Sequence, residues 1–225
     1  MTTVLCWDID GTLLNTGRAG IFALEDAAAE VIGKAVDFSQ LPTAGLTDRK
    51  IAINVLEAAG LEPEASKIEA LLELYAKYLP ESLPRRQGRV LSGVREILEQ
   101  LKSRSDVLSI LLTGNIYKGA QAKLTHYGLA EYFTHGAFAD LNEDRAAIAL
   151  AAVTIAEEIL GEVDRDRCFV IGDTPHDIQC CAAIQGKAIA VATGAYSLSE
   201  LEAHSPWWAI PNLPEPVVFL EKLQL

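Results

Sequence analysis

The chain has 225 residues, of which 50% are hydrophobic and 22% charged, and its formal net charge is −12. This length predicts one or two domains with a core large enough to fold unaided. The acidic surplus argues against a nucleic-acid partner, because most of the surface would repel a phosphate backbone. No apolar run approaches the roughly 20 residues that span a bilayer, and Met1–Trp7 lacks the basic region of a signal peptide. We therefore expect neither a membrane segment nor a membrane partner.

The cysteines indicate the redox environment. Four are present, Cys180 and Cys181 are adjacent, and none lies in a CxxC or Cys/His pattern typical of a metal site. So few cysteines in a chain of this length do not make a disulfide framework. We expect reduced, mostly buried thiols in a cytoplasmic protein.

Short apolar runs that end in polar residues mark the predicted strands. The first is Val4–Trp7, followed at once by Asp-Ile-Asp-Gly-Thr. Later runs, which end at Thr-Gly-Asn, Gly-Asp-Thr-Pro and Thr-Gly, are Val107–Leu112, Cys168–Ile171 and Ala188–Ala192. Helical patterns lie between them at Gly93–Lys102, Ile116–Tyr127, Ala146–Leu160 and His176–Ile184. This alternation predicts an α/β fold with a doubly wound parallel sheet, in which ligands bind at the carboxyl ends of the strands.

One long stretch, residues 17–84, carries only helical periodicity. The candidate helices are Ala19–Ile32, Asp48–Ala59 and Glu64–Tyr78, separated by prolines that include Pro80. Roughly 70 residues are too many for a single crossover connection. We interpret residues 17–84 as an inserted helical subdomain over the end of the first strand, and residues 1–16 and 85–225 as the α/β core.

Asp8 and Asp10 follow the first predicted strand. Side chains two residues apart at a strand end point the same way, and Gly11 then allows a sharp turn. Carboxylates this close repel each other unless one binds a proton or a cation lies between them. A hard divalent cation suits such oxygen ligands. The structural alternative is an Asp-Gly turn with two solvated acids.

Asp173 and Asp177 follow a later strand in the same manner. Thr174 can cap the next helix and Pro175 fits its first position, so both acids can lie on one side of the first turn. Acidic residues at a helix start also complement the helix dipole. That alternative explains Asp177 better than it explains carboxylates at the ends of two different strands.

Thr113–Asn115 and Arg145 complete the candidates. The first segment offers a hydroxyl and backbone N–H groups at the mouth of a helix, where phosphate binds; a plain capping turn is the alternative. Arg145 begins a helix against the dipole. It therefore either pairs with Glu143 or Asp144 or reaches into the site.

Together these segments resemble the motifs of the haloacid dehalogenase superfamily of phosphohydrolases, in particular its phosphoglycolate-phosphatase-like members with a helical cap. The residues that carry the resemblance are Asp8-Ile9-Asp10-Gly11-Thr12-Leu13, Leu112-Thr113-Gly114-Asn115, Arg145 and Ile171-Gly172-Asp173-Thr174-Pro175-His176-Asp177. It covers the whole chain and implies a Rossmann-like core with an inserted α-helical cap domain.

The resemblance also implies roles. Asp8 would be the nucleophile that forms an aspartyl-phosphate, and Asp10 the general acid/base. The phosphoryl oxygens would be bound by Thr113, Gly114, Asn115 and Arg145. Mg²⁺ would be held by Asp8, the backbone carbonyl of Asp10, Asp173 and Asp177. Mg²⁺ with an arginine supplies the charge neutralisation that phosphoryl transfer requires.

The basic residue departs from the family pattern, which usually has lysine where Arg145 stands. A guanidinium can bind phosphate through two parallel hydrogen bonds, so we interpret Arg145 as a variant. Lys123 and Lys187 are rival basic residues whose positions fit the family order poorly. Asp10 argues against dehalogenation, because the family's dehalogenases lack this second acid.

The helical insert contains a further motif, Thr43–Asp48, which resembles the substrate loop of phosphoglycolate-phosphatase-like caps. Gly45 would let the backbone approach the substrate, with Thr47 and Asp48 beside it. Alternatively, Thr47 or Asp48 simply caps the following helix.

The main interpretation is a Mg²⁺-dependent phosphatase acting on a small phosphomonoester. One alternative is another reaction on the same site, that of a phosphosugar mutase or a phosphonatase. The other is a phosphorylatable signalling module of receiver type, which Asp10 and the long insert argue against. The sequence leaves open the substrate and the choice between monomer and homodimer.

Overall fold

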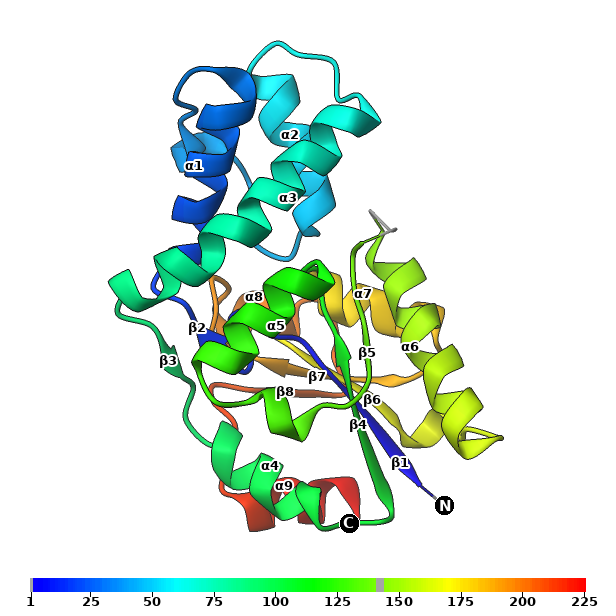
Figure 1. Cartoon of the computed structure of the whole chain (residues 1–225). Helices are drawn as coiled ribbons and strands as arrows, with labels where there is room; N and C mark the ends of the chain where they lie inside the picture. The colour runs from blue at the N-terminus through cyan, green and yellow to red at the C-terminus, as the bar shows by residue number, and fades with distance from the viewer. Residues whose placement is uncertain (1, 141–143) are drawn as a thin grey trace.

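The central sheet has the doubly wound arrangement expected from the sequence. The computed structural model describes residues 2–140 and 144–225. Its principal strands are β1 (Thr3–Trp7), β4 (Val107–Leu112), β5 (Gly136–Ala137), β6 (Cys168–Gly172), β7 (Lys187–Val191) and β8 (Trp208–Ile210). Within the described residues these form one parallel sheet in the order β5-β4-β1-β6-β7-β8 (Figure 1). The predicted α/β fold is confirmed.

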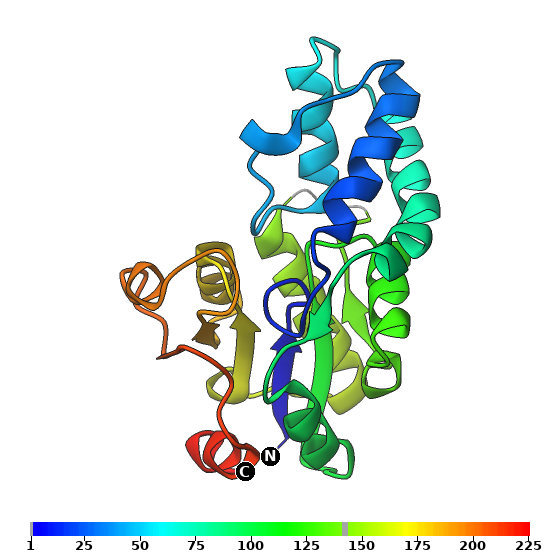
Figure 2. The ribbon, with the colours of Figure 1, turned by 90° about the vertical axis from the view of Figure 1, so that its left-hand side faces the viewer.

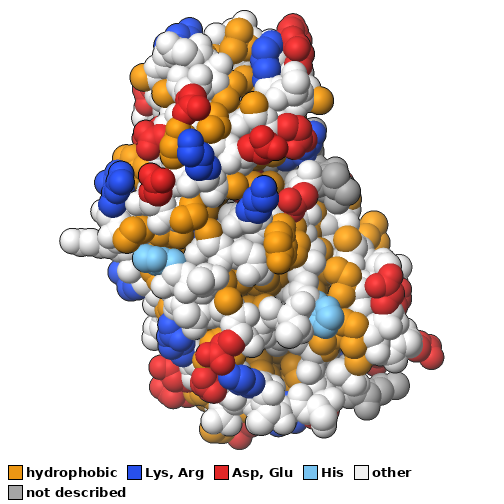
Figure 3. Space-filling view, in the orientation of Figure 1, with side chains coloured by type: hydrophobic (Ala, Val, Ile, Leu, Met, Phe, Trp, Pro, Cys, Tyr) orange, Lys and Arg blue, Asp and Glu red, His pale blue; other side chains and the backbone are white. Residues whose placement is uncertain are grey.

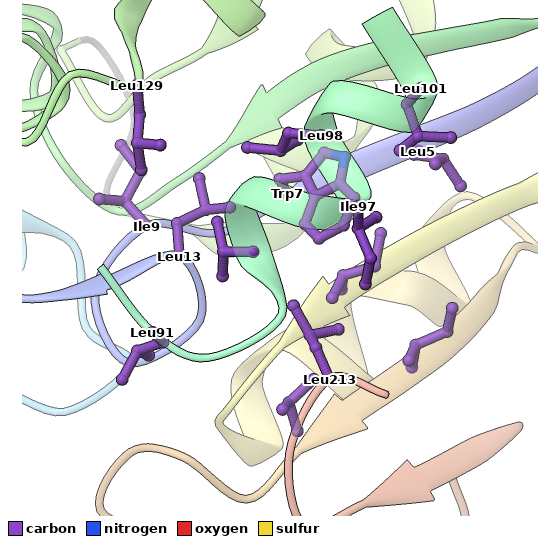
Figure 4. Close-up of a cluster of buried hydrophobic side chains, with 14 of the residues drawn as sticks. Leu5, Trp7, Ile9, Leu13, Leu91, Ile97, Leu98, Leu101, Leu129 and Leu213 are labelled. Atoms are coloured by element: carbon purple, nitrogen blue, oxygen red, sulfur yellow. The ribbon is translucent and has the colours of Figure 1, made fainter. Parts of the chain in front are cut away.

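Strand β1 is central, and its side chains alternate between two cores. Leu5 and Trp7 belong to the hydrophobic cluster on one face of the sheet, and Val4 and Cys6 to the cluster on the other. In Figure 4 the Trp7 ring lies beside Ile97 and Leu98, two residues of the first cluster. Burial on both faces explains why β1 is a continuous apolar run instead of an alternating one.

Helices cover each face of the sheet. On the Trp7 face lie α4 (Val94–Lys102), α5 (Tyr117–His126) and α9 (Pro216–Leu223). On the Cys6 face lie α6 (Arg145–Leu160), α7 (Pro175–Ala183) and α8 (Leu198–Glu202). The predicted strands of the sheet and the predicted helices that cover its faces are reproduced to within one residue, whereas β5, α8 and α9 were not expected.

Three helices form a separate unit, which we call the three-helix unit: α1 (Ala19–Ile32), α2 (Asp48–Ala58) and α3 (Ala65–Ser82). They pack around their own hydrophobic cluster and lie beyond the carboxyl ends of the strands (Figure 2). The connections into and out of the unit pair as short antiparallel strands, β2 (Leu14–Asn15) and β3 (Arg89–Val90). The domain boundaries at 16/17 and 84/85 stay a prediction.

Helix α3 differs from its sequence-based expectation at Pro80. We expected the helix to stop near Tyr78, because a proline removes one backbone hydrogen bond, yet α3 continues to Ser82. Its last turn is held by tertiary contacts. Leu79 and Leu83 are buried, and the Ser82 hydroxyl donates a hydrogen bond to the Ala19 carbonyl at 3.0 Å. Packing therefore outweighs the local preference.

No helix within residues 2–140 and 144–225 is long and apolar enough to cross a membrane. On the face in Figure 3, Lys and Arg side chains are interspersed with Asp and Glu side chains. This mixed pattern differs from the concentrated basic surface typical of nucleic-acid binding.

Candidate active site

The site begins where three neighbouring strands end. Because β1 lies between β4 and β6, the residues that follow these strands meet at one edge of the sheet. They are Asp8, Thr113 and Asp173, and all three are buried. The Asp8 N–H donates to the Ile171 carbonyl at 3.0 Å, which extends the β1–β6 ladder and fixes where Asp8 stands.

Three buried carboxyl groups converge at this edge. Asp8, Asp173 and Asp177 each contribute one oxygen to a group whose atoms all lie within 4.8 Å of one another. Asp177 also caps α7, because its Oδ2 accepts from the Thr174 N–H at 3.0 Å and from the Thr174 hydroxyl at 2.7 Å. Asp177 is therefore a helix-start acid that also lies within the acidic group.

Arg145 reaches into this acidic group. Its Nη1 lies 3.5 Å from Asp8 Oδ1, and its Nη2 pairs with Asp177 Oδ1. Asp144 instead caps α6 by accepting from the Ala146 N–H at 3.0 Å. Glu143, the other partner considered from the sequence, lies outside the described residues. Two buried carboxylates thus compensate the unfavourable interaction between the Arg145 charge and the helix dipole.

The charges in the group strongly perturb one another. Burial raises the pKa of Asp8; Arg145 opposes this effect and Asp10 adds to it. Burial and the nearby charge of Asp8 raise the pKa of Asp173 to about 8. One arginine does not compensate these acids fully, so a cation or protons are required at neutral pH.

The residues fit Mg²⁺, which prefers oxygen ligands. Asp8 and Asp173 offer carboxylate oxygens, and the contact to Asp173 from Thr12 Oγ1 is a long one of 3.3 Å. Gly11 keeps the chain close to Asp173, since a Cβ on Gly11 would lie 2.3 Å from Asp173 Oδ2. Its φ of 84° is also one that L side chains rarely adopt. The Asp-x-Asp-Gly turn therefore packs directly against a candidate metal ligand.

The Asp10 side chain belongs to a second cluster. Its Oδ2 accepts from Lys123 Nζ at 2.5 Å and from Asn115 Nδ2 at 2.8 Å. Burial alone would lower the pKa of Lys123, but the charges of Asp10, Tyr75 and Asp48 raise it above its ordinary value. The rival Lys187 lies at the start of β7, where it pairs with Asp166 at 3.6 Å.

The Thr113–Asn115 segment links the two clusters. Thr113 Oγ1 accepts from Asn115 Nδ2 at 2.8 Å and from the Asn115 N–H at 3.2 Å. Gly114 contacts the three-helix unit, since a Cβ there would lie 2.7 Å from the Leu46 carbonyl oxygen. The segment is therefore a local turn held by the Thr113 hydroxyl, but it gives α5 no side-chain cap, because the N-cap residue Ile116 makes no such hydrogen bond within the described part of the chain. Gly114 and Asn115 line a cavity at the sheet edge.

The Thr43–Asp48 loop docks on that same segment. Thr47 caps α2 by accepting from the Lys50 N–H at 3.1 Å, as one interpretation of the motif expected. Asp48 instead binds the start of α5: its N–H donates to the Gly114 carbonyl at 2.7 Å, and its Oδ2 accepts from the Ile116 N–H at 2.8 Å. The three-helix unit is thus hydrogen-bonded to the sheet edge at the site.

Gly45 is the point of closest approach in this loop. Its φ is 73°, and a Cβ there would lie 2.5 Å from His176 Cδ2 and 2.9 Å from Thr174 Oγ1. Glycine is required because a side chain would collide with the start of α7. In this conformation Gly45 contacts the α7 loop and lines the cavity beside it.

A cavity of about 420 Å³ lies between the sheet edge and the three-helix unit. Asp8, Asp10, Lys123, Arg145 and Asp173 line one side. The wall formed by the three-helix unit includes Ile21, Leu24, Leu46, Ile51 and Tyr75, with Arg18 also lining the cavity. The cavity thus has a charged floor at the sheet edge and a largely apolar wall formed by the three-helix unit.

Lys123 and Tyr75 are two lining residues that the sequence did not assign to the site. Lys123 was considered only as a rival of Arg145, because family order put little weight on it. A better signal is its place on the buried face of α5, beside Gly119, Ala120 and Leu124. A lysine in an apolar stripe requires a buried partner. Tyr75 carries no such signal, because an apolar helix face readily contains tyrosine.

Comparison with known proteins identifies the family. The model of the haloacid dehalogenase-like hydrolase family matches residues 5–191. The chain belongs to this family. It is therefore a member of a hydrolase family, and its predicted enzyme class is confirmed at that level.

Relatives of this hydrolase extend over nearly its whole length. It is 27% identical over 222 residues to "Probable phosphatase IndB" of Dickeya dadantii, covering 96% of this chain and 93% of that protein. A hydrolase from Pseudomonas syringae has the same fold, with a TM-score of 0.73 at 21% identity over 100% of this chain and 98% of that one. A predicted phosphoglycolate phosphatase from Haemophilus somnus gives 0.72 at 16% identity, with 98% of each chain covered.

Proposed function

We propose that this haloacid dehalogenase-like hydrolase is a Mg²⁺-dependent phosphatase that acts on small phosphomonoesters in the cytoplasm. The observation that carries the proposal is the buried group of Asp8, Asp173 and Arg145 on the floor of a small cavity. The relative named as a probable phosphatase supports the same reaction. The four cysteines are free and buried, which suits a reducing compartment.

Two steps account for the reaction. The Asp8 carboxylate attacks phosphorus, the bond to the leaving oxygen breaks, and Asp10 gives its proton to that oxygen. Water then attacks the aspartyl-phosphate and passes a proton to Asp10. The Asp8–phosphorus linkage breaks, phosphate leaves, and both acids return to their starting states.

The remaining residues bind charge. Arg145 and the Thr113–Asn115 segment, including the Gly114 backbone, would bind phosphoryl oxygens. Mg²⁺ would be held by Asp8, Asp173 and the backbone carbonyl of Asp10, with Asp177 supporting the site. When bound, it neutralises negative charge on the phosphoryl group.

We further propose that the three-helix unit is a cap that selects the substrate. Its apolar wall faces the charged floor across the cavity, so the group attached to phosphate would contact Leu24, Ile51 and Tyr75. Gly45, Thr47 and Asp48 would act by docking the cap loop beside the phosphate.

The test is phosphate release from a panel of small phosphomonoesters, with Mg²⁺ or with EDTA. We expect Mg²⁺-dependent release by the wild type and a loss of at least about 10³-fold in Asp8→Asn, because the nucleophile is removed. Asp166→Asn, a change at an exposed aspartate, is the matched control. Release that survives in Asp8→Asn would contradict the assignment. Interconversion of sugar phosphates without net release would instead favour a mutase.

A further inference from the structure

Lys123 is a buried lysine whose function the proposed reaction does not yet explain. It is 4% exposed and lies on the buried face of α5. A leucine at this place would avoid the free energy of moving an ammonium group out of water. A buried lysine is tolerated where carboxylates and hydrogen-bond acceptors surround it, so its partners indicate its role.

Those partners all converge on Asp10. Lys123 Nζ lies 2.5 Å from Asp10 Oδ2, and it also donates to Asn115 Oδ1. The amide of Asn115 donates to the same Asp10 oxygen at 2.8 Å. Two donors from α5 and the segment before it therefore fix Oδ2, and the carboxyl group can present Oδ1 to a ligand.

The ammonium group also lies against the three-helix unit. Tyr75 of α3 is 1% exposed, and a Cβ on Gly20 of α1 would lie 3.7 Å from the Tyr75 hydroxyl and 3.8 Å from Lys123 Nζ. Lys123, Tyr75 and Asp10 line the same cavity. The lysine is thus enclosed where the sheet edge meets the three-helix unit, on the side of the cavity that faces the group attached to phosphate.

We propose that Lys123 is a positioning residue, which holds the Asp10 carboxyl group toward the leaving oxygen of the substrate. The inference rests on the proposed phosphatase function and deepens it. Lys123 gains and loses no bond in the reaction. Its effect is on the geometry of the proton transfer, which requires Asp10 within hydrogen-bond reach of the oxygen that departs.

Asp10 needs this support. Its side chain is 42% exposed, and without Lys123 its Oδ2 would keep only the neutral amide of Asn115 as a hydrogen-bond donor within the described residues. We expect the carboxyl group then to sample several rotamers, of which only some reach the leaving oxygen. Removal of the Lys123 side chain should therefore lower kcat/KM most for substrates whose leaving oxygen needs a proton.

The test uses a series of substituted phenyl phosphates, from phenyl phosphate to p-nitrophenyl phosphate, assayed as kcat/KM with Mg²⁺. A nitrophenolate departs without a proton, whereas a phenolate of higher pKa benefits from one. We expect Lys123→Met to lower kcat/KM by at least about tenfold for phenyl phosphate and by less than about threefold for p-nitrophenyl phosphate. The dependence of log kcat/KM on leaving-group pKa then becomes steeper.

Two further variants complete the design. Lys118→Met, at an exposed lysine of the same helix, should leave the slope unchanged. Lys123→Arg keeps the positive charge and should restore the wild-type slope at least in part, whereas Lys123→Gln should not. If Lys123→Met does not fold, the Arg and Gln variants carry the same comparison.

The outcomes separate the inference from the proposed function. An equal loss of kcat/KM for every phosphate in the series would overturn the positioning role, and so would a change confined to the affinity for substrates with a second negative charge. A wild type that releases phosphate from none of the series or the wider panel would overturn the phosphatase proposal, and the inference with it.

Discussion

Arg145 occupies the first turn of α6, where its charge opposes the helix dipole, and its guanidinium is buried between Asp8 and Asp177. Local helix preferences do not favour an arginine there. The compensation comes from two carboxylates that are distant in sequence and that burial would otherwise leave uncompensated. The residue that departs from the usual family lysine is thus integral to the charge balance of the site.

Removal of this arginine should therefore destabilise the protein. We expect Arg145→Met to lower the free energy of unfolding by about 3 kcal/mol, since two buried carboxylates lose a partner. Urea unfolding monitored by circular dichroism in EDTA measures it. Arg104→Met, which removes an exposed ion pair with Asp106, is the control and should change little. Equal effects of the two substitutions would refute this view of Arg145.

At the scale of elements, the site depends on contacts between the Thr43–Asp48 loop and α5. Thr47 caps the helix that follows it, but Asp48 binds the Ile116 N–H at the start of a different helix. Burial raises the pKa of Asp48 to about 6. Thr47 and Asp48 are adjacent in the sequence, yet they stabilise the starts of two different helices. Only the capping of the following helix could be predicted from the sequence.

Loss of the Asp48 carboxylate should loosen this junction. In Asp48→Ala we expect the Ile116 amide to exchange with solvent at least about tenfold faster, because its buried acceptor is gone. Hydrogen exchange followed by NMR at single-amide resolution measures the effect. Asp37→Ala, which removes the side-chain cap of the short 3-10 helix Phe38–Gln40, should leave the exchange rate of the Ile116 amide unchanged. Unaltered exchange in Asp48→Ala would mean that other contacts hold the unit in place.

Some of these elements are determined by local sequence patterns and others by tertiary contacts, and only the first kind could be predicted. The strands and most helices could be predicted because periodicity and terminal residues are local properties. Strand β5 is too short to carry a period, and α3 continues past Pro80 through tertiary packing. The environment of Asp10 was also beyond local reasoning, since its partner Lys123 follows it by 113 positions.

The acidic group makes the stability of the whole molecule depend on pH, and we expect it to make stability depend on metal binding as well. Burial and the charge of Asp8 raise the pKa of Asp173 from 3.8 to about 8. Between those values the folded state binds a proton that the unfolded state does not. Stability in the absence of metal therefore falls as pH rises through this window. A divalent cation bound at Asp173 would compete with that proton, and we expect it to reverse the trend.

Thermal unfolding at several pH values measures this coupling. In EDTA we expect the Tm of the wild type to fall between pH 6 and pH 8 more than that of Asp173→Asn. The increase in Tm produced by Mg²⁺ should be larger at pH 8 than at pH 6, and Asp173→Asn should lose most of it. A Mg²⁺ effect that is the same in both proteins would place the metal elsewhere.

The most direct test of Asp8 as the nucleophile is to trap the covalent aspartyl-phosphate. The protein is mixed with a reactive small phosphomonoester and Mg²⁺, quenched in acid within the first turnover, and analysed by peptide mass spectrometry. We expect a phosphoryl group on Asp8, absent in Asp8→Asn and longest-lived in Asp10→Asn, where water is no longer activated. Phosphate release with no phosphoryl group on Asp8, or with one on another residue, would contradict it.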